Sequence, residues 1–159
     1  MSLLRNSIFS TIAIMAVALT QTSCNRQMIY CHYENIDTDG WRRNDTIYFE
    51  IPNNRDGNYA EILGLRIIGD YPYSNLSLIV SQRCNTQETT KSDTINIETT
   101  NEKGIPKGSG TNYRQTDIPL STVNLKAGDT LSVSIRHCMQ REILPGIANV
   151  GFSLKDTKE

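Results

Sequence analysis

The sequence predicts an all-β protein, an antiparallel β-sandwich with a jelly-roll-like arrangement, preceded by a helical signal peptide. Three observations support this prediction. Apolar and polar residues alternate in short runs along most of the chain, which is the period of a strand with one buried face. Gly, Pro, Asn and Asp residues that favour turns separate these runs. The longest apolar run lies ahead of the alternating part, within the first 23 residues.

The composition excludes several classes of protein. The chain has 159 residues, enough for a signal segment and one domain. Its 16 basic and 17 acidic residues give a net charge of -1, whereas a nucleic-acid-binding protein carries a basic excess. A hydrophobic content of 38% is too high for a wholly disordered chain. We therefore expect one folded domain that binds no nucleic acid.

The N-terminal segment has the form of a lipoprotein signal peptide. Arg5 precedes a run of 12 mostly apolar residues, 8–19, which is shorter than the roughly 20 residues that a spanning helix needs. Thr22 and Ser23 then lead to Cys24. A small residue before a cysteine suits the peptidase cleft, and the thiol accepts the diacylglycerol. An ordinary secretory signal and an uncleaved anchor are the alternatives.

These features divide the chain into three parts. We expect residues 1–23 to be the signal peptide and Cys24 to carry the lipid that attaches the protein to a membrane. Residues 24–34 would form the anchor and a short lead-in. Residues 35–159 would form a single β-sandwich domain, since no repeat or low-complexity linker marks a second one.

The alternating runs predict the strands in chain order. They cover residues 47–51, 63–67, 76–80, 95–97, 131–135 and 150–154. The turns between them fall at residues 53–58, 70–72, 104–110 and 127–129. Seven or eight short strands, each with one apolar face, pack as two antiparallel sheets face to face. The loop 104–110 holds three glycines, so we expect it to be mobile.

Charged residues on or beside strands need partners when they are buried. Arg66 and Arg136 have apolar neighbours on predicted strands, and Asp45 precedes another strand. We expect at least one of these three charges to be half-buried and paired.

Residues that could bind a metal ion do not form a site. Cys31 and His32 are adjacent, as are His137 and Cys138, and neighbours on a strand point to opposite faces. Residues 35–40 resemble the start of a calcium loop, but Thr46 stands where the bidentate Glu belongs, so a turn is the better interpretation. We expect no metal and no cofactor.

No motif supports catalysis. The sequence lacks G-x-S-x-G, and neither histidine has an apparent acid partner. We therefore predict that the protein is not an enzyme. The aromatic residues are more suggestive, since exposed rings could stack on a sugar or a peptide, although core-edge packing is the alternative. They are Tyr30, Tyr33, Trp41, Tyr48, Tyr59, Tyr71, Tyr73 and Tyr113.

The parity of the strands predicts where the cysteines point. Cys84 continues the apolar positions of its strand and should face inward, whereas Cys138 has the opposite parity and should face outward. The two therefore cannot easily pair. With Cys24 acylated, three thiols remain, so at least one is free, and whether Cys31 joins a disulfide stays open.

Several segments, taken together and in order, resemble the gliding-motility lipoprotein family of the GldH type. The segments are Trp41 and Asp45 ahead of Phe49; Leu65 and Arg66 followed by Tyr-Pro-Tyr-Ser-Asn-Leu at 71–76; Asp-Thr-Ile at 93–95; the glycine loop 104–110; Ala-Gly-Asp at 127–129; and 139–151, with Leu-Pro-Gly-Ile and Val-Gly. They cover nearly the whole chain after Cys24.

The resemblance implies a non-catalytic outer-membrane lipoprotein of the Bacteroidetes that is an accessory component of the gliding and type IX secretion machinery. Its partners would be other envelope proteins. Surface-exported lipoproteins of this group carry acidic residues after the lipidated cysteine, and residues 25–28 have none, which favours the periplasmic face. The alternative function is a carbohydrate- or peptide-binding lipoprotein. The candidate binding residues are Trp41, Arg66, Tyr71 and Tyr73.

Replacing Cys24 tests the lipid anchor. Cys24→Ala should abolish lipid attachment and signal-peptidase II cleavage, because the apolar run is too short to span and each buried acyl methylene contributes about 0.8 kcal/mol to membrane binding. The variant should remain as an uncut precursor in the inner membrane or become soluble in the periplasm. Metabolic labelling with a clickable palmitate reports this. Persistent labelling, or outer-membrane recovery equal to the wild type, would contradict the lipoprotein interpretation.

Overall fold

The computed structural model describes residues 28–69, 71–86 and 90–157. The expected signal peptide and Cys24 lie outside these residues. Within the described ranges, no helix is long and apolar enough to cross a membrane.

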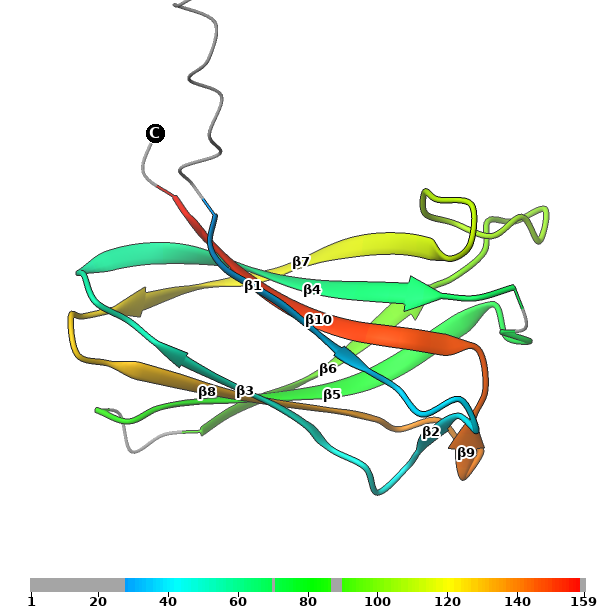
Figure 1. The fold of residues 1–159 in the computed structure, drawn as a ribbon, viewed down its shortest axis with the longest axis horizontal. Helices are drawn as coiled ribbons and strands as arrows, with labels where there is room; N and C mark the ends of the chain where they lie inside the picture. The colour runs from blue at the N-terminus through cyan, green and yellow to red at the C-terminus, as the bar shows by residue number, and fades with distance from the viewer. Residues whose placement is uncertain (1–27, 70, 87–89, 158–159) are drawn as a thin grey trace, which may run out of the picture.

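In the described residues, eight long strands form two four-stranded antiparallel sheets that pack face to face (Figure 1). The first sheet has the order β1 (Met28–Asn35), β10 (Ile147–Asp156), β4 (Gly57–Ile67) and β7 (Arg114–Leu125). The second sheet has the order β3 (Ile47–Pro52), β8 (Thr130–His137), β5 (Asn75–Cys84) and β6 (Thr90–Glu98). A short pair, β2 (Trp41–Arg42) and β9 (Ile143–Leu144), lies at one end.

The connections are those of a jelly roll. Every successive pair of long strands crosses between the two sheets, except β5 and β6, which form a hairpin within the second sheet. Two interleaved Greek keys produce this order. The predicted antiparallel β-sandwich of jelly-roll type is therefore confirmed.

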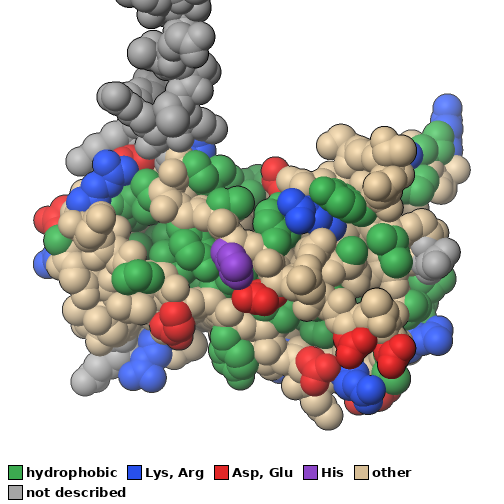
Figure 2. All heavy atoms as spheres, viewed as in Figure 1, with side chains coloured by type: hydrophobic (Ala, Val, Ile, Leu, Met, Phe, Trp, Pro, Cys, Tyr) green, Lys and Arg blue, Asp and Glu red, His purple; other side chains and the backbone are tan. Residues whose placement is uncertain are grey.

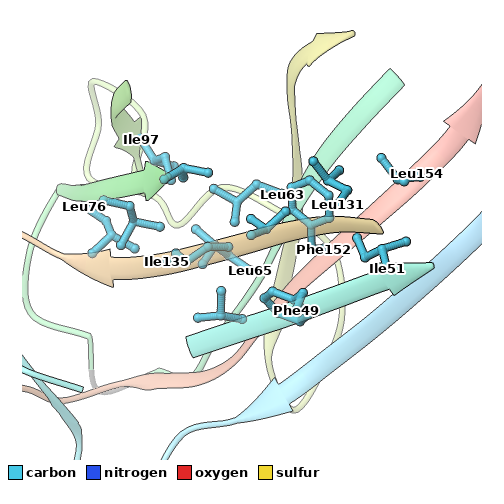
Figure 3. Close-up of a cluster of buried hydrophobic side chains, with 14 of the residues drawn as sticks. Phe49, Ile51, Leu63, Leu65, Leu76, Ile97, Leu131, Ile135, Phe152 and Leu154 are labelled. Atoms are coloured by element: carbon cyan, nitrogen blue, oxygen red, sulfur yellow. The ribbon is translucent and has the colours of Figure 1, made fainter. Parts of the chain in front are cut away.

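The core lies between the two sheets and follows the predicted alternation. Phe49 from β3 and Phe152 from β10 face each other across the sandwich, with ring centroids 6.1 Å apart (Figure 3). Leu63 and Leu65 of β4 are fully buried beside them. The six strands expected from alternation correspond to β3, β4, β5, β6, β8 and β10. Because both inner faces are apolar, their burial supplies the main driving force for folding.

The first strand corrects the expected domain boundary. We expected residues 24–34 to be a lead-in, but β1 starts at Met28 and pairs with β10 along its length, so the sandwich begins there and not at residue 35. Sequence reasoning missed β1 because it is an edge strand whose exposed and half-buried positions do not alternate. Cys31 and His32, adjacent in its middle, are both exposed.

The other long strand that was missed, β7, contains an irregularity at its centre. Pro119 lies on this edge strand, where the missing N–H costs least. Ala60 pairs with Thr122 and Ile62 with Pro119, so two residues of β7 stand opposite Glu61. This bulge brings Ser121 to Glu61, and the Ser121 hydroxyl donates to Glu61 Oε2 at 2.6 Å. The bulge thus gives a carboxylate that is only 1% exposed a hydrogen-bond partner.

The cysteines lie as their parity predicts. Cys84 is buried and Cys138 is exposed, and both are free, as is the exposed Cys31. The three described thiols therefore form no disulfide with one another.

The short β2–β9 pair covers a buried Trp41–His137 contact. The two rings meet edge to face with centroids 5.4 Å apart. Trp41 Nε1 donates to the Asp45 carbonyl at 2.9 Å. The Trp41 carbonyl can only accept, so His137 Nε2 carries the proton of their 3.1 Å hydrogen bond. His137 Nδ1 is buried and has no partner among the described residues, and burial lowers the pKa of this imidazole.

This contact predicts a loss of stability in acid. Because the folded state lowers the pKa of His137, the free energy of unfolding should fall as pH drops below the unfolded pKa of about 6.5 toward the folded value. Denaturant unfolding followed by Trp41 fluorescence at pH 7.5 and pH 5.5 measures the loss. His137→Gln should lose less stability over this interval than the wild type. His32→Gln, at the exposed histidine, is the matched control, and a wild-type-like loss in His137→Gln would contradict the assignment.

Candidate functional site

A pocket of about 260 Å³ opens at the end of the sandwich where β4 ends and β7 begins. Residues of the loops after β4 and before β7 line it, and both loops lie at the right of Figure 1. Its described lining includes three tyrosines, two isoleucines and two cations. These residues are Tyr71, Tyr73, Tyr113, Ile67, Ile68, Lys107 and Arg114.

Tyr71 and Tyr73 lie together in the β4–β5 connection. Their rings meet edge to face, with centroids 5.7 Å apart. The Tyr71 hydroxyl donates to the Asn75 carbonyl at 2.7 Å, and the Thr99 hydroxyl donates to the Tyr73 carbonyl at 2.7 Å. Burial raises the pKa of Tyr71, so its phenol stays protonated. On the far side, a Cβ on Gly146 would lie 2.5 Å from the Tyr71 nitrogen, so the β9–β10 turn packs closely here.

The glycine loop that closes the pocket is held by hydrogen bonds. Lys107 N donates to the Thr99 carbonyl at 2.8 Å, and Ser109 and Gln115 exchange two backbone hydrogen bonds at 3.1 and 2.8 Å. Gly108 has a φ of 97°, and a Cβ there would lie 2.6 Å from the Gln115 oxygen. The glycines therefore permit a close backbone approach. This bonding argues for a structured loop, against the expected mobility.

One row of paired residues crosses the outer face of the first sheet: Tyr33, Gly151, Gly64 and Asp117. A Cβ on Gly151 would lie 2.6 Å from Tyr33 Cδ1, and one on Gly64 would lie 2.6 Å from Tyr33 Cζ. The Tyr33 ring therefore extends across both glycines. Its hydroxyl reaches Asp117 Oδ1 at 3.4 Å. Burial first, and Asp117 next, raise the pKa of Tyr33 to about 12.

Arg66 stacks beside this row. Its guanidinium carbon lies 4.0 Å from the centroid of the Tyr33 ring and 5.0 Å from that of Tyr113. Its Nε donates to Gln115 Oε1 at 3.2 Å. The prediction that one of three charges is half-buried and paired is confirmed for Arg66, although its partners are two rings and an amide and not a carboxylate. Arg136 and Asp45 are exposed.

Described residues of both charges lie at this end of the molecule. Besides the tyrosines, the ionisable side chains among the described residues that line the pocket are the cations Lys107 and Arg114. Lys107 pairs with Glu98 at 2.5 Å. On the face shown in Figure 2, several acidic side chains gather around a basic one at the lower right, where Figure 1 places β2 and β9. In the part of the chain that the structure describes, no three His, Cys, Asp or Glu side chains group as metal ligands.

The structure divides the four candidate binding residues. Tyr71 and Tyr73 lie together in the pocket. Arg66 lies next to the pocket, because the Tyr113 ring that it stacks on also lines the pocket. Trp41 does not belong to the site: it is 2% exposed, so its ring is part of the core and the expectation that it binds a ligand is wrong.

Sequence reasoning missed the role of Tyr33. Gly64 and Gly151 interrupt two apolar strands, and an isolated glycine in a strand signals a close approach of another group. That signal could have located the surface, but it does not say which ring covers the glycines.

The model of the GldH lipoprotein family matches residues 28–154, which is the whole sandwich except its last few residues. The chain belongs to the GldH lipoprotein family. The resemblance seen in the sequence is thereby confirmed. Membership associates the chain with gliding motility and makes it a membrane-anchored lipoprotein of the cell envelope.

Two relatives agree with the family assignment. The gliding motility lipoprotein GldH of Flavobacterium johnsoniae is 25% identical over 154 residues, which cover 89% of this chain and 93% of the relative. A GldH homolog of Christiangramia forsetii is 27% identical over 159 residues, covering 94% and 96%.

Solved structures are similar only at low scores. A family 35 carbohydrate-binding module from Clostridium thermocellum gives a TM-score of 0.41 with 12% identity, covering 79% of this chain and 88% of the module. The Eiger TNF structure from S. frugiperda gives 0.36 with 14% identity, covering 84% and 95%. These scores are too low to bear on what this GldH-family chain does.

Replacing Gly151 by a larger residue tests whether the Tyr33 ring packs on the two glycines. Gly151→Ala should lower the free energy of unfolding by about 1–3 kcal/mol, because the added methyl group would overlap the Tyr33 ring at Cδ1 and force the ring to move away from the sheet. The pKa of Tyr33 should then fall from about 12 toward its usual value, which NMR of labelled tyrosine measures. Gly69→Ala is the matched control, since a Cβ there meets nothing within 4 Å. Unchanged stability and an unchanged Tyr33 pKa in Gly151→Ala would contradict this packing.

Proposed function

We propose that the chain is a non-catalytic accessory component of the gliding-motility and type IX secretion machinery. It is attached to the outer membrane through a lipid on Cys24, with its domain on the periplasmic face, and it binds another envelope protein. The observation that carries this proposal is the tyrosine-lined pocket at the end of the sandwich opposite the start of β1.

The position of the pocket relative to β1 supports binding away from the membrane. β1 starts at Met28, which pairs with Lys155, whereas the pocket adjoins Ile67, which pairs with Arg114 at the other end of the sheet. The eight residues of β1 span roughly 25 Å. Cys24 lies four positions before Met28, so the link can reach at most about 14 Å. A lipid on Cys24 would therefore hold the β1 start near the bilayer and leave the pocket accessible.

The lining of the pocket supports binding in place of catalysis. The hydroxyls of Tyr71 and Thr99 both donate to backbone carbonyls and so act structurally. None of the described lining residues forms a nucleophile–base pair. Ile68 and Tyr113 are 39% and 37% exposed at the rim. An aromatic and aliphatic centre with a polar surround is the composition of a protein-binding surface.

The alternative carbohydrate-binding function has less support. The expected stacking residue Trp41 is buried, and the Tyr71 and Tyr73 rings pack against each other. A protein partner does not need an open planar ring, because aliphatic and aromatic side chains of the partner can fill the pocket.

A charge placed at the pocket rim tests the interface. In the producing bacterium, Ile68→Asp should reduce formaldehyde crosslinks between the lipoprotein and its envelope partner at least about tenfold, because the partner would bury an unpaired carboxylate. Colony spreading and export of secretion cargo should fall with the crosslinks.

Ile143→Asp is the matched control, since Ile143 is 36% exposed and lies on β9, outside the pocket lining. Both variants should still fractionate with the outer membrane. Wild-type crosslinks and spreading in Ile68→Asp would show that the pocket is not the interface.

A further inference from the structure

We propose that the guanidinium of Arg66 is a docking site for the side-chain carboxylate of an Asp or Glu residue of the partner protein. This inference rests on the proposed function for the origin of the partner, but the recognition chemistry follows from the Arg66 site itself. Arginine presents a planar fork of N–H donors that matches the two oxygens of a carboxylate.

The Arg66 side chain is pre-organised. The Tyr33 ring packs on Gly151 and Gly64. The guanidinium carbon of Arg66 lies 4.0 Å from the centroid of this ring, on which the guanidinium stacks. The hydrogen bond from Nε to Gln115 Oε1 fixes the rotation of the guanidinium plane. A side chain held in this way loses little conformational entropy when a ligand binds, which favours affinity.

The terminal nitrogens of Arg66 are available. Among the described residues, Arg66 has no ion pair, whereas Arg43 pairs with Glu142 at 3.9 Å and Arg55 with Asp156 at 2.9 Å. Asp117 is the acid of the Tyr33 row, and its Oδ1 accepts from the Tyr33 hydroxyl and from Gln115 Nε2, each at 3.4 Å. In the described part of the chain, the half-buried cation therefore has ring and amide partners but no carboxylate, which leaves its Nη donors for one from a partner.

The geometry favours a carboxylate on a protein over one on a sugar. Sugars bind proteins by stacking on an open ring, and the Tyr33 ring lies between the two glycines and Arg66. What remains is the edge of the guanidinium, which offers hydrogen bonds and charge.

The location of Arg66 joins this docking site to the pocket. The Tyr113 ring lies 5.0 Å from the Arg66 guanidinium carbon and also lines the pocket. A partner segment with an apolar side chain in the pocket could therefore place a neighbouring acidic residue on Arg66. Arg114, at the pocket itself, adds a second positive charge.

Binding of defined tripeptides tests the proposal on the purified full-length lipoprotein in detergent micelles. The probes are end-capped Ala-Glu-Ala and Ala-Gln-Ala, and the readout is the Nε–H NMR resonance of Arg66, assigned by its loss in Arg66→Lys. The Glu peptide should shift this resonance saturably, and the Gln peptide should not. In Arg66→Lys, competition measured on backbone amides of β4 and β7 should show binding at least about tenfold weaker, because the bidentate contact is lost.

Two further variants keep the test sharp. Gln115→Glu leaves Arg66 in place but supplies an internal carboxylate beside its Nε, so binding of the Glu peptide should be lost while the fold is retained. Arg136→Lys, at an exposed arginine of β8, is the matched control and should bind like the wild type.

Three results would overturn the proposal: an equal response to both peptides, unweakened binding in Arg66→Lys and Gln115→Glu, or a response to glucuronate or inorganic phosphate without one to the Glu peptide. Glucuronate alone would identify an acidic-sugar site. Since the experiment uses no cells, its failure leaves the envelope role to be decided by the crosslinking of the Ile68→Asp variant.

Discussion

The register of β10 between β1 and β4 is the constraint on which the rest of the first sheet depends. It places Gly151 beside Gly64 and both under the ring of Tyr33, which starts from the neighbouring strand. A slip of one residue would turn Phe152 outward and put its ring where Tyr33 lies. The buried apolar face of β10 and the glycine row on its outer face therefore enforce the same register, and the position of Arg66 follows from it.

The strands that could be predicted from sequence are those with one face buried in the core and the other face exposed to solvent. The central strands β8 and β5 alternate cleanly and were predicted, as was the alternating edge strand β3, whereas the edge strands β1 and β7 do not alternate and were missed. An edge strand tolerates irregularities such as a proline at position 119, because water can form hydrogen bonds with backbone groups on the free edge that are not paired in the sheet. The cysteine positions were predictable because parity alone decides which face Cys84 and Cys138 occupy.

The candidate site was only partly predictable, for a different reason. Tyr71 and Tyr73 are close in sequence, and a local motif found them. Trp41 has the residue type of a binding platform, but its orientation depends on an acceptor at Asp45 and on His137, far away in the chain. The packing of Tyr33 on the two glycines requires β1, β10 and β4 to lie side by side in this register, and no local sequence pattern shows which strands are neighbours.

The proline and the bulge in β7 have a consequence for a protein held on a membrane. A lipid anchor confines copies to a plane, where exposed sheet edges meet far more often than they would in free solution. An exposed edge strand would then act as a template on which the sheet of another copy could pair edge to edge. Pro119 and the bulge opposite Glu61 break the ladder on one such edge, and the charged pair Lys91–Asp93 lies on the edge strand β6 beside it. Both features therefore disfavour edge-to-edge pairing between crowded copies.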